Sequence, residues 1–277
     1  MKRRVVGIVG VGAIGGSIGM RARRDGALVV GYDCDAGALA EAIELGAIDF
    51  AATREELYAR AGTVAIAAHL DATLEELRRL RDEGPLRATL ILDVASVKSP
   101  VVETAGDLAA FVATHPMAGS HRAGVRAASP TAFDGKTWAY VPSRDPAAVD
   151  RARAFVRSLG AVPVAVDAAA HDRIVAFTSH LPQIVAGCYA SAARRRRDET
   201  FDALLGSAAR ELLRLGESGF AMWRPILAAN ATAVSADLAT LASALSAAAE
   251  ALAAGRVDGL RTAFPVDKSR FDGAQGP

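Results

Sequence analysis

The chain has 277 residues, enough for one large domain or two modest ones, each with its own buried core. Its 32 Lys and Arg balance 31 Asp and Glu to a net charge of +1, which excludes a broad field for attracting nucleic acid or an anionic membrane and favours a small-molecule partner. Two widely separated cysteines, Cys34 and Cys188, suit a reducing compartment, so we expect a cytoplasmic protein.

The N-terminus runs from Met1-Lys-Arg-Arg straight into an apolar strand pattern, without the features of a cleaved signal peptide. From residue 5 to about residue 167, short β-rich runs alternate with helical patterns, as in a parallel sheet covered by helices. The predicted strands are 5–9, 28–32, 63–68, 89–94, 111–114, 137–142 and 162–166. The predicted helices are 13–24, 36–45, 55–60, 71–82, 100–109 and 146–159.

A glycine-rich turn joins the first predicted strand to the first predicted helix. This placement directs free backbone N–H groups and the helix dipole at a pyrophosphate. The first glycine allows the tight turn, the second lets the phosphates approach the backbone, and the third lets the helix pack closely on the strand. The pattern predicts a Rossmann-type dinucleotide site. The residues expected to bind the cofactor here are Gly10, Gly12, Ala13, Ile14 and Gly15.

An acidic residue follows the second predicted strand. Asp33 lies 18 residues after Gly15, where a carboxylate can accept hydrogen bonds from the adenosine ribose hydroxyls of a dinucleotide. An NADP enzyme normally has an arginine here, whereas Cys34 and Asp35 follow in this chain. The sequence therefore favours NAD, although Asp33 could also cap the helix that follows.

Polar residues stand at the ends of the later strands. Ligands of open α/β sheets bind outside the carboxyl ends of the strands, so we expect these side chains to converge on a site beside the nucleotide. They are His69, Ser96, Lys98 and His115. His69 and Ser96 are assigned to the cofactor.

After Asp167 the β-rich runs stop, and residues 170–253 read as helices with breaks near 194–198, 216–219 and Pro225. We therefore expect a dinucleotide-binding domain over residues 1–167 and a helical domain over 168–277. The fold class is α/β, a Rossmann-type mostly parallel sheet followed by an all-helical domain. Polar residues interrupt the alanine-rich stretch before residue 254, so no membrane span is predicted. One face of this stretch should be buried.

Four motifs follow the dinucleotide turn in order. They are Asp93-Val-Ala-Ser-Val-Lys98, Thr114-His-Pro-Met-Ala-Gly119, Ser179-His-Leu-Pro182, and Arg214 with Met222-Trp223 beyond it. This set resembles the prephenate/arogenate dehydrogenase family of tyrosine biosynthesis over nearly the whole chain. The resemblance implies NAD-dependent oxidative decarboxylation of prephenate to 4-hydroxyphenylpyruvate, and a homodimer formed through the helical domain.

The resemblance also implies roles for particular residues. His115 takes the proton from the C4 hydroxyl while hydride leaves C4 for the nicotinamide, and a neutral imidazole suits that task because its ordinary pKa is about 6.5. Ser96 hydrogen-bonds the same hydroxyl or the carboxamide. Arg214 is the carboxylate clamp, because a guanidinium can hold a carboxylate in two places. No metal is needed.

His180 is the other candidate for substrate binding. On an ideal helix from residue 171, His180 and His171 lie about 180° apart, so one helix cannot present both to one pocket. We therefore assign His180 to the site and His171-Asp172 to the start of a helix. Pro182 predicts a kink just past His180, and Trp223 is expected to pack.

Two positions depart from the family pattern. The chain has Ser120-His121-Arg122 where an acidic residue is common, and His69 where a proline is expected. A basic mouth would disfavour the ammonium group of arogenate and favour the doubly anionic prephenate. Arogenate or an amino-substituted prephenate remains an alternative substrate with the same mechanism.

Two other functional classes would leave different marks in the sequence. A 3-hydroxyacid dehydrogenase would need a catalytic lysine on a helix of the second domain, but the only lysine after residue 168 is Lys268, in the tail. A non-catalytic nucleotide-sensing module would need no base at a strand end, and its function would survive His115→Ala.

Overall fold

The computed structural model describes residues 3–83, 87–118 and 123–263. Its first part is a six-stranded parallel sheet in the order β3-β2-β1-β4-β5-β6. The strands are β1 (Val5–Val9), β2 (Leu28–Tyr32), β3 (Phe50–Ala51), β4 (Thr63–Ile66), β5 (Leu90–Asp93) and β6 (Phe111–Val112). The strand order reverses between β1 and β4, which makes the end of β1 the switch point where such sheets bind ligands.

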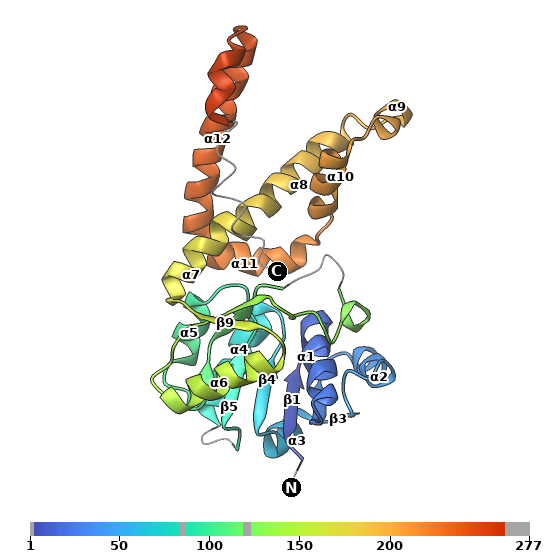
Figure 1. Ribbon diagram of the computed structural model, residues 1–277, viewed down its shortest axis with the longest axis vertical. Helices are drawn as coiled ribbons and strands as arrows, with labels where there is room; N and C mark the ends of the chain where they lie inside the picture. The colour runs from blue at the N-terminus through green and yellow to red at the C-terminus, as the bar shows by residue number, and fades with distance from the viewer. Residues whose placement is uncertain (1–2, 84–86, 119–122, 264–277) are drawn as a thin grey trace.

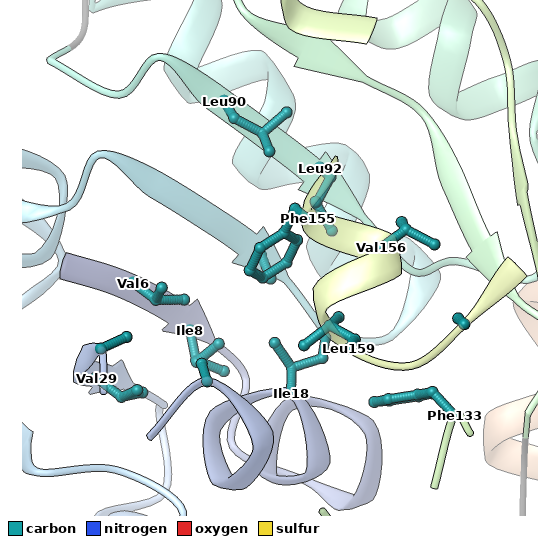
Figure 2. Close-up of a cluster of buried hydrophobic side chains, with 14 of the residues drawn as sticks. Val6, Ile8, Ile18, Val29, Leu90, Leu92, Phe133, Phe155, Val156 and Leu159 are labelled. Carbon is teal, nitrogen blue, oxygen red and sulfur yellow. The ribbon is translucent and has the colours of Figure 1, made fainter. Parts of the chain in front are cut away.

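Alternating side chains of the strands fill two hydrophobic cores, one on each face of the sheet. Val6 and Ile8 of β1 lie in one core, while Val9 lies in the other. The first core is closed by α1 (Ala13–Arg24) and α6 (Pro146–Ser158), whose Ile18 and Phe155 are drawn in Figure 2. The other face is covered by α3 (Arg54–Arg60), α4 (Leu70–Asp82) and α5 (Ser99–Ala105), while α2 (Ala36–Glu44) lies beside β3 (Figure 1).

A second, three-stranded sheet is formed by β7 (Thr114–Pro116), β8 (Thr137–Tyr140) and β9 (Val162–Ala165). β7 pairs with β8 antiparallel, and β8 pairs with β9 parallel. The sequence predicts one continuous strand over 111–114, and this is wrong: the parallel strand ends at Val112, and Thr114 already belongs to the second sheet. The reason is a contact with Asp93 of β5: the N–H of Thr114 donates to Asp93 Oδ1, and the hydroxyl of Thr114 donates to the carbonyl of Asp93.

From Ala168 onward the described chain is helical. The elements are α7 (Ala168–Val175), a π-helical turn (Ala176–His180), α8 (Leu181–Arg194), α9 (Glu199–Ala203), α10 (Ser207–Gly216), α11 (Phe220–Ala229), α12 (Ala231–Ala253) and a 3₁₀ segment (Val257–Ala263). The predicted break at Pro225 is wrong, because Pro225 lies inside α11 and the chain turns only at Asn230. The predicted disturbance near Pro182 takes the form of the π turn before α8.

Two arms project from the sheet domain in Figure 1, one made of α12 and the other of α8 with α9 and α10. α11 packs on α4, and α7 packs on α5, so the helices sit directly on the sheet domain. By length and composition alone α12 could cross a membrane, and only 6% of its most apolar window is buried. The expectation that its apolar side is covered is thus not met within one chain, since Leu245 is 60% exposed.

Candidate active site

The glycine-rich turn lies at the switch point of the sheet, immediately after β1. Gly10 has φ +90°, a conformation that glycine adopts without strain. A Cβ on Gly15 would collide with the carbonyl oxygen of Gly10, whereas a Cβ on Gly12 would meet no atom within 4 Å. The space before the N-terminus of α1, with Ala13 and Ile14 in its first turn, is therefore open to a phosphate.

Asp33 is fixed by the same turn. Its Oδ2 accepts from the N–H of Val11 at 2.9 Å, and its Oδ1 accepts from the N–H of Asp35 at 3.0 Å. Asp35, and not Asp33, caps α2, by accepting from the N–H of Gly37. Asp33 is therefore available for a cofactor hydroxyl.

A hollow of about 570 Å³ opens beside Asp33. It is lined by the end of β2, the start of α3 and Arg79 of α4, and its polar residues include Thr53 and Glu55. The open helix N-terminus, the carboxylate of Asp33 and this hollow together fit the phosphates and the adenosine end of a dinucleotide.

A buried ion pair stands under the ends of β5 and β7. Lys98 and Asp93 are both 0% exposed, and Lys98 Nζ lies 2.5 Å from Asp93 Oδ2 and 2.6 Å from the carbonyl oxygen of Thr114. Burial lowers the pKa of Lys98, and Asp93 opposes this shift. The pair thus fixes the backbone of β7 directly before His115.

His115 is the first member of a chain of polar groups that leads into the helical region. Its Nδ1 lies 2.9 Å from Nε2 of His171, and Nδ1 of His171 lies 2.8 Å from Oδ1 of Asp172. Asp172 in turn accepts from the N–H groups of Lys98, at 2.6 Å, and Ser99, at 2.8 Å. The assignment of His171-Asp172 to a helix start is wrong, because Asp167 caps α7 and both residues lie inside the helix.

The surroundings of His115 keep it neutral. Burial lowers its pKa well below the ordinary value, and the nearby Lys98 lowers it further, while Asp172 has the opposite effect. Burial also opposes ionisation of Asp172, but hydrogen bonds from His171, Ser99 and Lys98 outweigh it and lower the pKa of Asp172 to about 2. A neutral imidazole next to an ionised carboxylate is the arrangement of a general base with a supporting partner.

His180 lies at the end of the π turn and is 1% exposed. Its Nδ1 is 3.3 Å from Nδ2 of Asn230, which also donates to the carbonyl of Asp172 at 2.7 Å. Burial lowers the pKa of His180 to about 4. Within the described ranges, Nε2 of His180 and Nε1 of the neighbouring Trp223 are buried without a hydrogen-bond partner, and the two rings meet edge to face at 5.8 Å. Two such N–H groups could serve an acceptor on a substrate.

The remaining predicted residues are distributed around this centre. Ser96 is half-buried in the loop from β5 to α5, two residues before Lys98, and His69 is exposed at the N-cap of α4. Arg214 lies in the last turn of α10, where its Nε and Nη2 donate to Oε2 of Glu211. His121 and Arg122 lie outside the described residues.

Sequence reasoning missed His171 and Asn230. The helical-wheel argument against His171 assumes one regular helix from residue 171 to residue 180, but the π turn over 176–180 changes the phase between the two histidines. It also assumes that both would face one cavity. His171 instead reaches His115, and the two meet edge to face with ring centroids 5.1 Å apart.

Two family models together match most of the chain. The model for the nucleotide-binding domain of prephenate dehydrogenase matches residues 18–165. The model for the dimerization domain of prephenate dehydrogenase matches residues 167–265.

Two curated relatives are similar in sequence. A probable prephenate dehydrogenase, NovF, from Streptomyces niveus is 35% identical over 256 residues, covering 90% of this chain and 69% of the relative. A prephenate dehydrogenase from Bacillus subtilis is 32% identical over 239 residues, covering 80% of this chain. The match spans only 63% of the length of the Bacillus protein.

Two solved structures share the fold. The prephenate dehydrogenase from A. aeolicus, in complex with hydroxyphenyl propionate and NAD+, has a TM-score of 0.82 at 23% identity, covering 95% of this chain and 96% of that chain. The arogenate dehydrogenase of Synechocystis has a TM-score of 0.76 at 23% identity, covering 97% of this chain and 99% of that chain.

Proposed function

This chain belongs to the prephenate dehydrogenase family, and we propose that it catalyses the NAD-dependent oxidative decarboxylation of prephenate to 4-hydroxyphenylpyruvate. The observation that carries the proposal is the half-buried, neutral His115, which follows the carboxyl end of β6, while the open glycine turn follows the carboxyl end of β1 in the same parallel sheet. With a base and a nucleotide site at the same end of the parallel sheet, the base can take the hydroxyl proton of a carbinol while the nicotinamide takes the hydride from its carbon.

The cofactor would be held by the first turn of α1 and by Asp33. The amides around Gly12 and Ala13 would meet the pyrophosphate, and the carboxylate of Asp33 would accept from the adenosine ribose hydroxyls, with Ser96 and His69 at the neighbouring strand ends. The bound nicotinamide supplies the hydride acceptor. Because Asp33 would repel a 2′-phosphate, NAD is preferred over NADP.

The residues of this chain then control one proton. His115 accepts it from the C4 hydroxyl, and Ser96 holds that hydroxyl in place. When the ring carboxylate leaves as CO2, its bonding electron pair passes through the ring to the C4 oxygen, and His115 returns the proton there to give the phenol. Charge and atoms balance, and aromatisation makes the step effectively irreversible.

The substrate carboxylates need donors, and two are proposed. His180 would donate from its buried Nε2, which is without a partner among the described residues, and Arg214 would supply a guanidinium. The positive charge of the Arg214 guanidinium would disfavour the ammonium group of arogenate, so prephenate is the preferred substrate. Arogenate and an amino-substituted prephenate are the alternative substrates, with the same mechanism.

The test compares kcat/KM for prephenate and arogenate, each with NAD and with NADP, in the full chain. Prephenate with NAD should give the highest value, and His115→Asn should abolish NADH formation while NAD still binds. Equal turnover by His115→Asn would falsify the catalytic assignment. A higher kcat/KM for arogenate would replace the substrate and leave the mechanism standing.

The proposed state is a cytoplasmic homodimer, with the domain boundary near residue 167. The dimer is supported by the match of residues 167–265 to a dimerization domain and by the exposed apolar side of α12. The cytoplasm suits Cys34 and Cys188, which are both exposed and free.

A further inference from the structure

The hydrogen bonds between His115, His171 and Asp172 determine which ring nitrogens carry a hydrogen. Asp172 is ionised, because the hydrogen bonds that it accepts lower its pKa to about 2. An ionised carboxylate can only accept, so the hydrogen in the 2.8 Å contact with His171 is carried by Nδ1 of His171.

The same reasoning extends to the next contact. A neutral imidazole carries one N–H, so Nε2 of a neutral His171 is an acceptor. The 2.9 Å contact then requires Nδ1 of His115 to be the donor, which leaves Nε2 of a neutral His115 without a hydrogen. We propose that His171 and Asp172 are positioning residues that hold His115 in its Nδ1–H tautomer, so that Nε2 is the base. The base role itself rests on the proposed function.

Burial makes this arrangement selective. His171 is 3% exposed and Asp172 is 7% exposed, so water has little access to replace either partner. A neutral histidine free in water exchanges between two tautomers, only one of which has its lone pair on Nε2. Holding that tautomer removes the fraction of molecules in which the base would present an N–H to the substrate hydroxyl.

The series of hydrogen bonds from His115 to Asp172 also joins the two domains. Asp172 lies on α7, yet its carboxylate accepts from the amides of Lys98 and Ser99, which follow directly on the loop that carries Ser96. One carboxylate therefore fixes both the loop of Ser96 and, through His171, the imidazole of His115. The tautomer of His115 depends on α7 being seated against α5.

The titratable groups around His115 come from four elements. Asp93 ends β5 and its partner Lys98 is the N-cap residue of α5, His171 and Asp172 lie on α7, and His180 lies in the π turn. Lys98, His171 and His180 disfavour a proton on His115, and Asp172 favours it. When Nε2 takes the substrate proton, the Nδ1–H still points at His171, so the carboxylate of Asp172 stabilises the cation without moving.

Two substitutions at one position separate this role from packing. In His171→Gln an amide oxygen can still accept from Nδ1–H of His115, whereas His171→Leu removes the acceptor. Asp167→Ala is the control. It removes the N-cap of α7, which accepts from the N–H of Ala170, but it leaves His115, His171 and Asp172 unchanged.

The first measurement is ¹⁵N NMR of the histidine rings in the full-length protein at neutral pH. We expect protonated Nδ1 and bare Nε2 for His115 in the wild type, in His171→Gln and in Asp167→Ala, and a mixture of tautomers in His171→Leu. A wild-type protein with the proton on Nε2 of His115, or a His171→Leu variant that keeps the wild-type spectrum, overturns the proposal.

The second measurement is the kinetics of prephenate oxidation. In His171→Leu, kcat should fall about 100-fold, KM for NAD should stay unchanged, and His171→Gln should recover most of the loss. Equal losses in His171→Gln and His171→Leu would mean a packing role and overturn the proposal. Because the NMR readout needs no turnover, a wild type with the expected tautomer but no activity on prephenate would overturn only the proposed function.

Discussion

Replacing Lys98 by methionine should be among the most destabilising single changes in the sheet domain. Methionine keeps a long unbranched side chain but removes the charge that lies 2.5 Å from Asp93. Asp93 would keep the amides of Ala95 and Thr114 as donors, at 2.9 and 2.8 Å, but would be a buried carboxylate with no cation. Breaking a buried pair from one side costs about 3–5 kcal/mol.

Urea unfolding followed by far-UV circular dichroism measures this cost. With a slope of about 3 kcal/mol per molar urea, a loss of about 4 kcal/mol lowers the midpoint by about 1.3 M. The matched control is Arg144→Met, which removes one partner of the ion pair Arg144–Asp107, whose side chains are 93% and 85% exposed. An exposed pair contributes little, so this midpoint should move by about 0.3 M or less.

A double substitution checks the cause. Adding Asp93→Asn to Lys98→Met removes the unpaired charge. The loss in the free energy of unfolding of the double variant should therefore be smaller than the sum of the losses in the two single variants. If Lys98→Met moved the midpoint no further than Arg144→Met does, the argument from a buried charge would be refuted.

Four further outcomes are expected. Gly12→Ala should keep the thermal stability of the wild type, since its Cβ meets no atom within 4 Å, but should weaken NAD binding at least about tenfold by calorimetry, because the methyl group enters the phosphate space. Asp33→Ser with Cys34→Arg should shift the ratio of kcat/KM towards NADP, and unchanged kinetics would refute the role of Asp33. Burial in the folded state lowers the pKa of His180 from 6.5 to about 4, so between these pH values the unfolded chain binds more protons than the folded one. The free energy of unfolding should therefore fall by about 3 kcal/mol as the pH is lowered from 6.5 to 4, and His180→Gln should make this pH dependence shallower in urea titrations. Leu245→Arg should convert a dimer to monomers in sedimentation velocity, and a dimer that survives would place the interface away from this part of α12.

The start of the fold was predictable because its signals are local. The strand at 5–9, the glycine turn and the helix at 13–24 lie where the sequence predicts them, since alternation, glycine positions and apolar spacing all act within a few residues. The two-residue strand β3 was missed because it is too short for a periodic pattern. The split after Val112 was missed because it depends on Asp93, about twenty residues earlier, whose carboxylate and carbonyl both engage Thr114.

The sheet half of the candidate site was predictable from the positions of its residues alone, whereas His180 and Arg214 of the helical half came from the family resemblance. Ser96, Lys98 and His115 follow strands, and the carboxyl ends of parallel strands meet at one edge whatever connects them. The helical half has no such rule. Where His171 points depends on the seating of α7 on α5 and on the π turn, and neither leaves a periodic signal in the sequence.

The chemistry at position 171 explains why the link between the domains runs through a histidine. The link must accept from one side and donate to the other across a single side chain, and its two polar atoms must lie on opposite edges. Imidazole meets this need, because Nε2 faces His115 while Nδ1 faces Asp172. Glutamine carries both polar atoms at one end and can complete only the first contact, and a hydroxyl is too short to span both. The second domain therefore supplies more than a wall for the substrate: its carboxylate, acting through one imidazole, determines which nitrogen of the base in the first domain is free to react.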